Sequence, residues 1–107
     1  MTQKPFRVEL KAKETRLEAR FFGELTIDAE AALEGAFHGA DLSARPAVLV
    51  DFTAVPYVNS AGIAALMVAL MYLRDRSSGI RFVGLNRHLE KLFRMTGFPA
   101  LVTMERI

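Results

Sequence analysis

The sequence predicts a single α/β domain in which helices pack on a mixed, mostly parallel sheet with an antiparallel first strand. Near the N-terminus, two runs of alternating apolar and polar residues flank a polar stretch, which is typical of a β-hairpin. Further along, apolar runs of strand length alternate with segments of helical length. This pattern is typical of parallel strands joined by crossover helices, so the expected order is ββαβαβαβ. The 107 residues match the size of one domain, which we expect to extend over 1–107.

The first part of the chain is predicted to contain the hairpin and one helix. Residues 6–10 and 17–21 are the two alternating runs, and residues 11–15 form the turn between them. Gly23 then supplies a residue that can adopt a positive φ where the chain leaves the sheet. Asp28 is the predicted N-cap of the first helix. The core face of this helix is formed by apolar residues at helical spacing, namely Ala29, Leu33, Ala36 and Phe37.

The central stretch, residues 55–62, is where we expect the functional site. Residues 47–50 before it are all apolar, which is typical of a strand buried on both faces. Residues 61–73 contain no charge and no proline, which favours a helix. Asn59 and Ser60 are both good N-cap residues for this helix. Its free backbone N–H groups would point outward beside the end of the strand.

The last part of the chain is predicted to add two strands and a third helix. Residues 77–79 provide the C-terminal stop of the central helix, and residues 80–84 form a strand. Asn86 is the predicted N-cap of the third helix, which ends at Gly97. Residues 101–104 form a final short strand. The third helix carries the apolar residues Leu89, Leu92 and Phe93.

The composition indicates a globular chain that works in the cytoplasm. Hydrophobic residues make up 51% and charged residues 24% of the chain, which excludes a disordered protein. The apolar run over 61–73 is too short to span a bilayer, and residues 1–11 lack the apolar core of a secretory signal. Because the chain has no cysteine, disulfides, thiolate metal sites and cysteine nucleophiles are excluded.

The net charge of +2 is unevenly distributed. Residues 1–23 hold six Lys/Arg and three Asp/Glu, residues 24–73 hold one and six, and residues 74–107 hold seven and three. The basic residues are scattered, whereas nucleic-acid binders usually place them in one stripe with aromatic residues between them. We therefore expect no nucleic-acid partner.

Candidate catalytic and metal-binding residues are few. His38 and His88 fall in different predicted helices without a metal-like spacing, so we expect no metal and no cofactor. Asp51 follows the buried strand, at the end where open α/β sheets bind ligands. A phospho-accepting receiver domain is one alternative, but the acidic pair and the lysine that receivers need are missing. We interpret Asp51 as structural, with hydrogen bonds to the following loop. A small enzyme using Asp51 and Ser60 is a further alternative that lacks a base, so we expect no catalytic residue.

The central helix carries apolar residues on both sides. At 100° per residue, one broad face suits the sheet; it consists of Gly62, Ile63, Leu66, Ala69, Leu70 and Leu73. The opposite side carries Ser60, Ala64, Val68 and Met71, with Met67 at its border. A helix that covers an open sheet is normally polar on its outer side. The apolar outer side therefore predicts a partner surface, and deeper burial of the helix is the alternative.

These segments resemble the STAS domain family, named for sulfate transporters and anti-sigma factor antagonists. The resemblance covers nearly the whole chain and implies the STAS fold of the stand-alone antagonist type. It is carried by Gly-Glu-Leu at 23–25, Val-Leu-Val-Asp-Phe at 48–52, Tyr-Val-Asn-Ser-Ala-Gly-Ile at 57–63 and Thr-Gly-Phe at 96–98.

The resemblance implies a function for the central stretch. In stand-alone antagonists the motif is typically Asp-Ser-Ser-Gly or Asp-Ser-Thr-Gly. An anti-sigma factor that is also a serine kinase phosphorylates its first serine, and a serine phosphatase resets the protein. By this match, Ser60 is the expected phosphoacceptor. The expected partner-binding residues are Asn59, Ser60, Ala61, Gly62, Ala64, Met67, Val68 and Met71. The resemblance also allows a STAS subunit of a cytoplasmic transport or stress-signalling complex that works without phosphorylation, and a homodimer is left open.

Overall fold

A computed structural model describes residues 5–106 of the chain. Over this range, five strands and three α-helices occur in the predicted order, and one 3₁₀ turn that was not predicted lies before the last strand. They are β1 (Arg7–Ala12), β2 (Arg16–Phe22), α1 (Ala29–His38), β3 (Ala47–Ala54), α2 (Ser60–Arg74), β4 (Gly79–Leu85), α3 (Arg87–Met95), η1 (Phe98–Ala100) and β5 (Thr103–Arg106). None of these helices has the length and hydropathy that a bilayer crossing requires.

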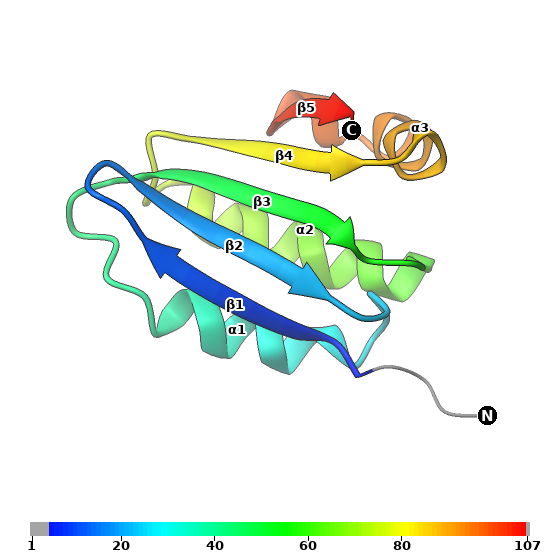
Figure 1. Ribbon diagram of the computed structural model, residues 1–107, viewed down its shortest axis with the longest axis horizontal. Coiled ribbons are helices and arrows are strands. Elements are labelled where there is room, and N and C mark those ends of the chain that lie inside the picture. The colour runs from blue at the N-terminus through cyan, green and yellow to red at the C-terminus, as the bar shows by residue number, and fades with distance from the viewer. Residues whose placement is uncertain (1–4, 107) are drawn as a thin grey trace.

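The five strands lie in the sheet in the same order as in the sequence (Figure 1). β1 is antiparallel to β2, and the pairs from β2 to β5 are parallel, which confirms the predicted α/β class and its antiparallel first strand. The hairpin turn is shorter than predicted. The Lys13 N–H donates to the Arg16 carbonyl at 2.8 Å, so residues 11 and 12 extend β1.

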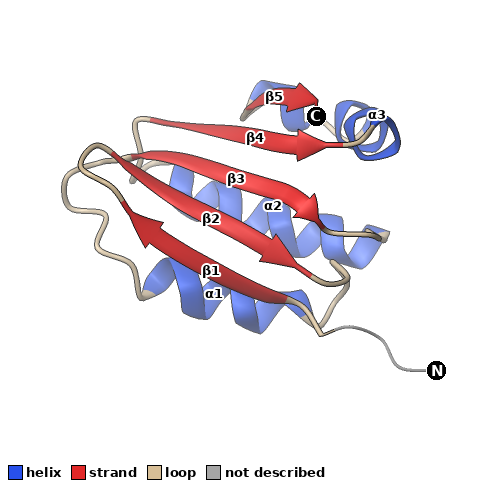
Figure 2. Ribbon diagram, in the orientation of Figure 1, coloured by secondary structure: helices blue, strands red, loops and turns tan. Residues whose placement is uncertain are grey.

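The three α-helices of the described chain pack on the same face of the sheet. Figure 2 shows α1 and α2 behind the strands. α3 belongs to the same layer because Phe93 contacts both Phe52 of β3 and Phe82 of β4, with ring centroids 5.2 and 5.5 Å apart. The cluster continues to Phe21 and Phe98. The core is therefore built around aromatic rings between the sheet and one layer of helices.

The other face of the sheet carries no helix over residues 5–106, which corrects the prediction that residues 47–50 are buried on both faces. The two valines of this run are buried, but Leu49 is only half-buried, and Asp51 and Thr53 follow it on the same open face. An apolar run can thus occur in a strand with one solvated face when a single leucine lies among charged neighbours. Ion pairs cover this face, including Arg7–Glu9, Arg16–Glu18, Arg20–Asp51 and Arg81–Glu105.

Two predicted helix-end signals, the Asp28 cap and the stop at residues 77–79, are wrong. Asp28 precedes α1, but its side chain makes no capping hydrogen bond and its backbone is already helical, with φ −66° and ψ −15°. A tight turn starts the helix instead, because the Ala29 N–H donates to the Thr26 carbonyl at 3.0 Å. α2 ends at Arg74, close to the predicted Leu73, but residues 77–79 are not its stop: Asp75 is the C-cap, and residues 77–79 lead directly into β4.

Three other local signals are confirmed. Asn86 caps α3, with its side-chain oxygen accepting the Leu89 N–H at 2.8 Å. Gly23 and Gly97 both adopt a φ of 87°, where the chain leaves β2 and where α3 gives way to η1. These predictions were correct because each position has a strict backbone requirement, a cap or a positive φ, that few residue types can meet.

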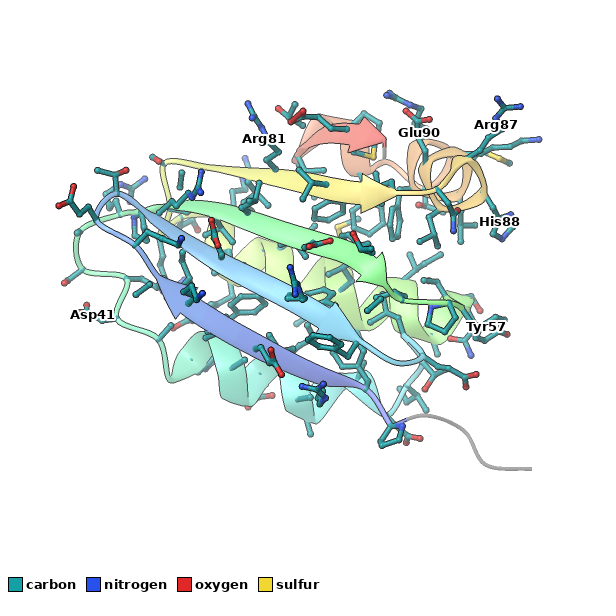
Figure 3. The ribbon with its side chains drawn as sticks, viewed as in Figure 1. Asp41, Tyr57, Arg81, Arg87, His88 and Glu90 are labelled. Atoms are coloured by element: carbon teal, nitrogen blue, oxygen red, sulfur yellow. The ribbon has the colours of Figure 1, made fainter. Side chains whose placement is uncertain are left out.

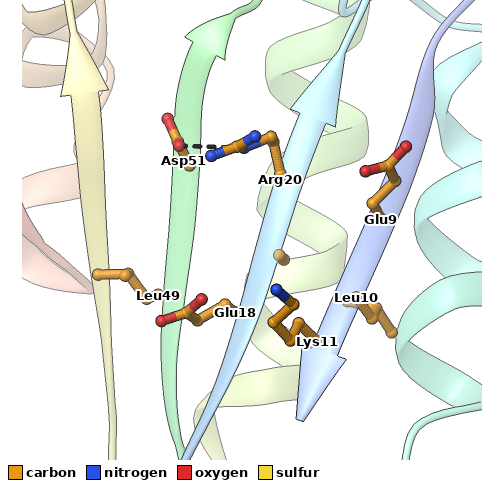
Figure 4. A pocket seen from close by; sticks show the side chains of 8 residues that line it. Glu9, Leu10, Lys11, Glu18, Arg20, Leu49 and Asp51 are labelled. Atoms are coloured by element: carbon orange, nitrogen blue, oxygen red, sulfur yellow. Dashed lines mark ion pairs between the residues drawn. The ribbon is translucent and has the colours of Figure 1, made fainter. Parts of the chain in front are cut away.

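Asp51 has a structural role, but not at the predicted place. It lies within β3 rather than at its end, and it bonds Thr53 of the same strand rather than the following loop. One carboxylate oxygen accepts the Thr53 N–H at 2.8 Å and the Thr53 hydroxyl at 2.6 Å. The other oxygen lies 3.4 Å from Nε of Arg20 (Figure 4). Gly84 permits this arrangement, because a Cβ there would lie 2.6 Å from the carboxylate oxygen.

The electrostatics of Asp51 follow from these contacts. Burial acts to raise its pKa, but the Thr53 hydrogen bonds and the Arg20 charge outweigh burial and hold the pKa below the ordinary value of 3.8. The ionised form is therefore favoured in the folded protein relative to the unfolded chain.

The loops that follow β2 and β3 are joined by backbone hydrogen bonds. Leu25 pairs with Val58 in an isolated parallel bridge. The Leu25 N–H donates to the Tyr57 carbonyl at 2.9 Å, and the Asn59 N–H donates to the Leu25 carbonyl at 3.2 Å. These bonds fix the path of residues 55–59 and hence the point at which α2 begins.

Gly62 brings the first turn of α2 against the loop after β2. It is buried, and a Cβ at this position would lie 1.8 Å from the Leu25 carbonyl oxygen and 2.9 Å from the Thr26 nitrogen. Both atoms belong to the backbone, so neither can move aside by a simple side-chain rotation. The position therefore requires glycine for a close approach of two backbone segments.

We predict that Gly62→Ala destabilises the protein by about 3 kcal/mol or more, at the upper end of overpacking effects, because the added methyl must displace backbone. Gly35→Ala in α1 is the matched control, since a Cβ there would meet nothing within 4 Å. The control should gain up to about 1 kcal/mol from higher helix propensity. Urea unfolding measures both. A Gly62→Ala variant as stable as the wild type would contradict the close approach.

For Asp51→Asn we predict a loss of about 1–2 kcal/mol at neutral pH, because an amide accepts the Thr53 bonds but lacks the charge that strengthens them. The folded pKa lies below the unfolded pKa, so the carboxylate stabilises the protein above the unfolded pKa of about 3.9. This stabilisation is lost as the pH falls through the folded pKa.

Unfolding by urea between pH 7 and pH 3 checks this prediction. The difference between the wild type and Asp51→Asn should stay constant above about pH 5 and shrink below it. Glu14→Gln, in the exposed turn after β1, is the control and should change stability by less than about 0.5 kcal/mol. A difference that does not depend on pH would show that the Asp51 charge has no such role.

Candidate functional site

The candidate site lies where the strands β2 and β3 end and α2 begins. Asn59 is the N-cap of α2, with φ −116° and ψ 177°, and its side-chain oxygen accepts the Gly62 N–H at 2.8 Å. Of the two predicted cap residues, the structure therefore assigns Asn59, and Ser60 becomes the first residue of the helix. The Asn59 carbonyl also accepts the Ile63 N–H at 2.9 Å, which starts the regular helix.

Ser60 presents a free hydroxyl beside unsatisfied backbone donors. Its side chain is exposed, and within residues 5–106 its hydroxyl has no hydrogen-bond partner. Asn59 occupies the Gly62 N–H, and the N–H groups of Ser60 and Ala61 have no acceptor in the same part of the chain. The helix end therefore offers two free donors and the positive end of its dipole next to an accessible hydroxyl.

The outer side of α2 is exposed and apolar, as predicted. We call Ser60, Ala64, Val68 and Met71 the α2 surface, since all four are exposed. The exposed fraction reaches 68% for Val68 and 49% for Met71. An exposed valine and methionine one turn apart form an apolar patch without a partner in the described chain. The alternative that the helix is buried on both sides is therefore wrong.

The other predicted binding residues have different environments. Asn59, Ala61 and Met67 are half-buried, and Met67 packs against the core. Gly62 is buried, so its place in the motif is explained by the approach to Leu25. Because these four residues are buried or half-buried, their main effect is to hold α2 in place, and they contribute little exposed area to the α2 surface.

Two exposed apolar residues at this end of the molecule were missed from the sequence. Tyr57 lies in the loop before α2 (Figure 3) and Ile27 in the loop after β2. Their exposed fractions are 50% and 58%. The hydrogen bonds between the two loops bring these segments together at the start of α2. The only sequence signal for Ile27 is an isolated apolar residue in a turn, which is a weak one.

A groove between α1 and α2 was also missed. It has a volume of about 210 Å³, and Val68 of the α2 surface forms part of its wall. Sequence periodicity places residues on a helix face but does not show how closely two helices approach, so it does not predict such a groove.

The candidate catalytic pair is not assembled. Asp51 lies on the open face of the sheet, whereas Ser60 begins a helix on the other side. Neither histidine is near a metal-like cluster, because residues 5–106 contain no group of three or more His, Asp or Glu residues placed to hold a metal. His38 instead stacks on Tyr72, with ring centroids 3.9 Å apart.

Comparison with solved structures shows proteins of the same architecture. An anti-sigma factor antagonist from Mycobacterium paratuberculosis superposes with a TM-score of 0.76 and 20% identity, over 99% of this chain and 92% of that one. The anti-sigma factor antagonist SpoIIAA in its unphosphorylated form superposes with a TM-score of 0.62 and 20% identity, over 95% and 88%. At these identities the likeness concerns the fold.

Sequence comparisons give the family. The anti-sigma-B factor antagonist of Listeria monocytogenes is 31% identical over 58 residues, which are 54% of this chain and 51% of that protein, and the Listeria innocua protein matches equally. The match thus spans about half the length of these curated relatives. The family described as "Mlab, STAS domain" matches residues 6–103. This match covers nearly all of the chain and confirms the resemblance seen in its motifs: the protein belongs to the STAS domain family.

Proposed function

We propose that this protein is a non-catalytic regulatory module that binds an anti-sigma factor with serine kinase activity. The binding site consists of the 55–59 loop and the α2 surface, and phosphorylation of Ser60 controls binding. The observation that carries the proposal is the position of Ser60 on the same exposed side of α2 as the apolar residues Val68 and Met71, with a hydroxyl that has no hydrogen-bond partner within residues 5–106.

The apolar part of the α2 surface supplies the affinity in this proposal. Interface hot spots are well-packed apolar or aromatic groups that lose water on binding. Met71 and Val68 supply such apolar groups in the C-terminal half of α2, and Tyr57, in the loop before its N-terminus, adds an aromatic ring. The antagonists among the similar proteins support this role, since their names describe proteins that counteract anti-sigma factors.

Ser60 supplies the control. A phosphate adds about −1.5 to −2 charge. While solvated, that charge gains about 0.3–1 kcal/mol from the helix end and its free donors. Burying the charge unpaired beneath a docked protein costs several kcal/mol. The penalty is larger than the gain, so phosphorylation of Ser60 should release the partner.

A second candidate function rests on the residues that flank Ser60. Asn59 and Ala61 stand where the antagonist motif usually has Asp and Ser or Thr. This difference favours a STAS subunit of a cytoplasmic transport or stress-signalling complex that uses the same surface without phosphorylation. The two functions differ in whether a charge at position 60 and a cognate kinase matter.

For Met71→Glu we predict an unchanged fold and binding to the cognate anti-sigma factor weakened by about thirty-fold, since hot spots contribute about 2 kcal/mol or more. Met95→Glu is the matched control, because Met95 is 74% exposed at the end of α3, outside the α2 surface. Calorimetric titration and thermal melting measure the two effects. A large fall in the melting temperature of Met71→Glu would show that this side chain is needed for folding.

A charge at position 60 should weaken the complex much more. We predict that Ser60→Asp or phosphorylated Ser60 raises the dissociation constant up to about a thousand-fold, which corresponds to about 4 kcal/mol. Ser60→Ala should bind like the wild type. The protein is incubated with the cognate kinase and ATP, any phosphate is mapped by mass spectrometry, and each form is titrated against the partner. If Ser60→Asp binds as well as Ser60→Ala, the switch is wrong and the second candidate function stands.

A further inference from the structure

The groove between α1 and α2 has an apolar floor and an acidic wall. Leu33 and Phe37 of α1 and Ala65 and Ala69 of α2 line it, and all four are buried core residues. The two alanines leave the space that larger side chains would fill. Glu30 and Glu34 of α1 line the same groove and are exposed.

The two glutamates lack counter-charges of their own. They lie four residues apart, one helical turn, on the same side of α1. Neither forms an ion pair within residues 5–106, whereas the carboxylates of Glu9, Glu18 and Asp51 on the open sheet face are all paired with arginine. Residues 24–38 contain four acidic residues and no lysine or arginine. The groove therefore combines an apolar lining, accessible at Val68 and Tyr72, with two carboxylates that form no ion pair within residues 5–106.

The other end of the groove is closed by aromatic stacking. His38 stacks on Tyr72 at 3.9 Å with an interplanar angle of 15°, and the Arg76 guanidinium lies 4.0 Å from the Tyr72 ring centroid. From Glu30 to His38 the groove runs for about 12 Å along α1, at 1.5 Å per residue. This length suits about two turns of a bound helix.

We propose that this groove binds a basic amphipathic helix of the partner protein. The apolar face of that helix would lie over the two alanines and contact Val68 and Tyr72, the accessible apolar side chains of the groove. Its lysine or arginine side chains would pair with Glu30 and Glu34. This inference rests on the proposed function, because Val68 belongs to both the groove and the α2 surface. The inference adds to the proposed function that the partner segment is a basic amphipathic helix, and it extends the interface from α2 to α1.

Charge argues against two other occupants. An anionic lipid surface would be repelled by the unpaired glutamates. A second copy of this chain offers a basic helix in α3, but Leu89 and Phe93 of α3 are buried in its own core. Arg94 of α3 is also paired with Glu90. α3 of a second copy therefore lacks the exposed apolar ridge that the groove requires, and the exposed apolar side of α2 has a single basic residue at its end, Arg74.

The test uses the full chain and two synthetic helices of 14 residues. One has leucine and alanine on one face with arginines at its borders, and its twin has glutamate in place of each arginine. The ¹⁵N-labelled protein is titrated with each peptide and followed by NMR. We expect the arginine peptide to shift amide signals of α1 and α2 and to bind roughly ten-fold or more tightly than its twin.

Charge reversal makes the test sharper. In the Glu30→Lys/Glu34→Lys variant, the preference should invert in favour of the glutamate peptide. The control is Glu9→Lys/Glu14→Lys, which changes the net charge equally, from +2 to +6, on β1 and its turn. The control should keep the wild-type preference. Equal binding of both peptides, or an inverted preference in the control, would overturn the groove's charge recognition.

Other outcomes would also overturn it. These are binding to phosphatidylglycerol vesicles through α1, or self-association that Glu30→Lys/Glu34→Lys abolishes. The proposed function is tested separately by Met71→Glu against the natural partner. Loss of binding in Met71→Glu, together with an unchanged peptide preference in Glu30→Lys/Glu34→Lys, would retain the docking module and reject the basic helix.

Discussion

The site depends on the close contact between the first turn of α2 and the loop after β2. Gly62 allows the helix backbone to approach Leu25, and the Leu25 N–H and carbonyl bond the loop before the helix. One short segment thus fixes both the loop and the helix start. Because Asn59 and Ser60 lie between these constraints, the serine is held in one position by backbone geometry and needs no bond of its own. This rigidity suits a surface that must be recognised in a defined shape.

The polarity of the molecule is divided between two faces. On the open sheet face, carboxylates are paired with arginines, and Asp51 is further bonded by Thr53. On the helix side, the outer face of α2 is apolar, and Glu30 and Glu34 of α1 form no ion pair with any described residue. When the charged side chains of a face already form ion pairs with one another, that face attracts a charged partner only weakly. The helix side has both apolar area and unpaired charge, which is the combination that gives affinity and orientation in an interface.

Much of this organisation could be predicted from the sequence, and the failures have physical causes. Element order, the Asn86 cap and the exposed side of α2 depend on local periodicity and single-residue preferences, and these were predicted. The prediction that residues 47–50 are buried on both faces was wrong. Burial on the second face requires a second layer of helices, which no local pattern shows. The groove and the reason for Gly62 depend on distances between segments far apart in the chain. The pairing of Asp51 with Arg20 depends on strand register in the same way.

Because the strands have the same order in the sequence and in the sheet, the protein can begin to fold while it is being translated. Each strand pairs with the one synthesised just before it, so no strand must wait for a later segment to find its neighbour. Contacts close in sequence cost less chain entropy to form, and topologies built from them fold faster. At about 5–20 residues per second, the ribosome releases the hairpin first and then one strand and helix at a time. The sheet can therefore grow from one edge during translation, and β3 and α2 complete the binding surface before the last strand has emerged.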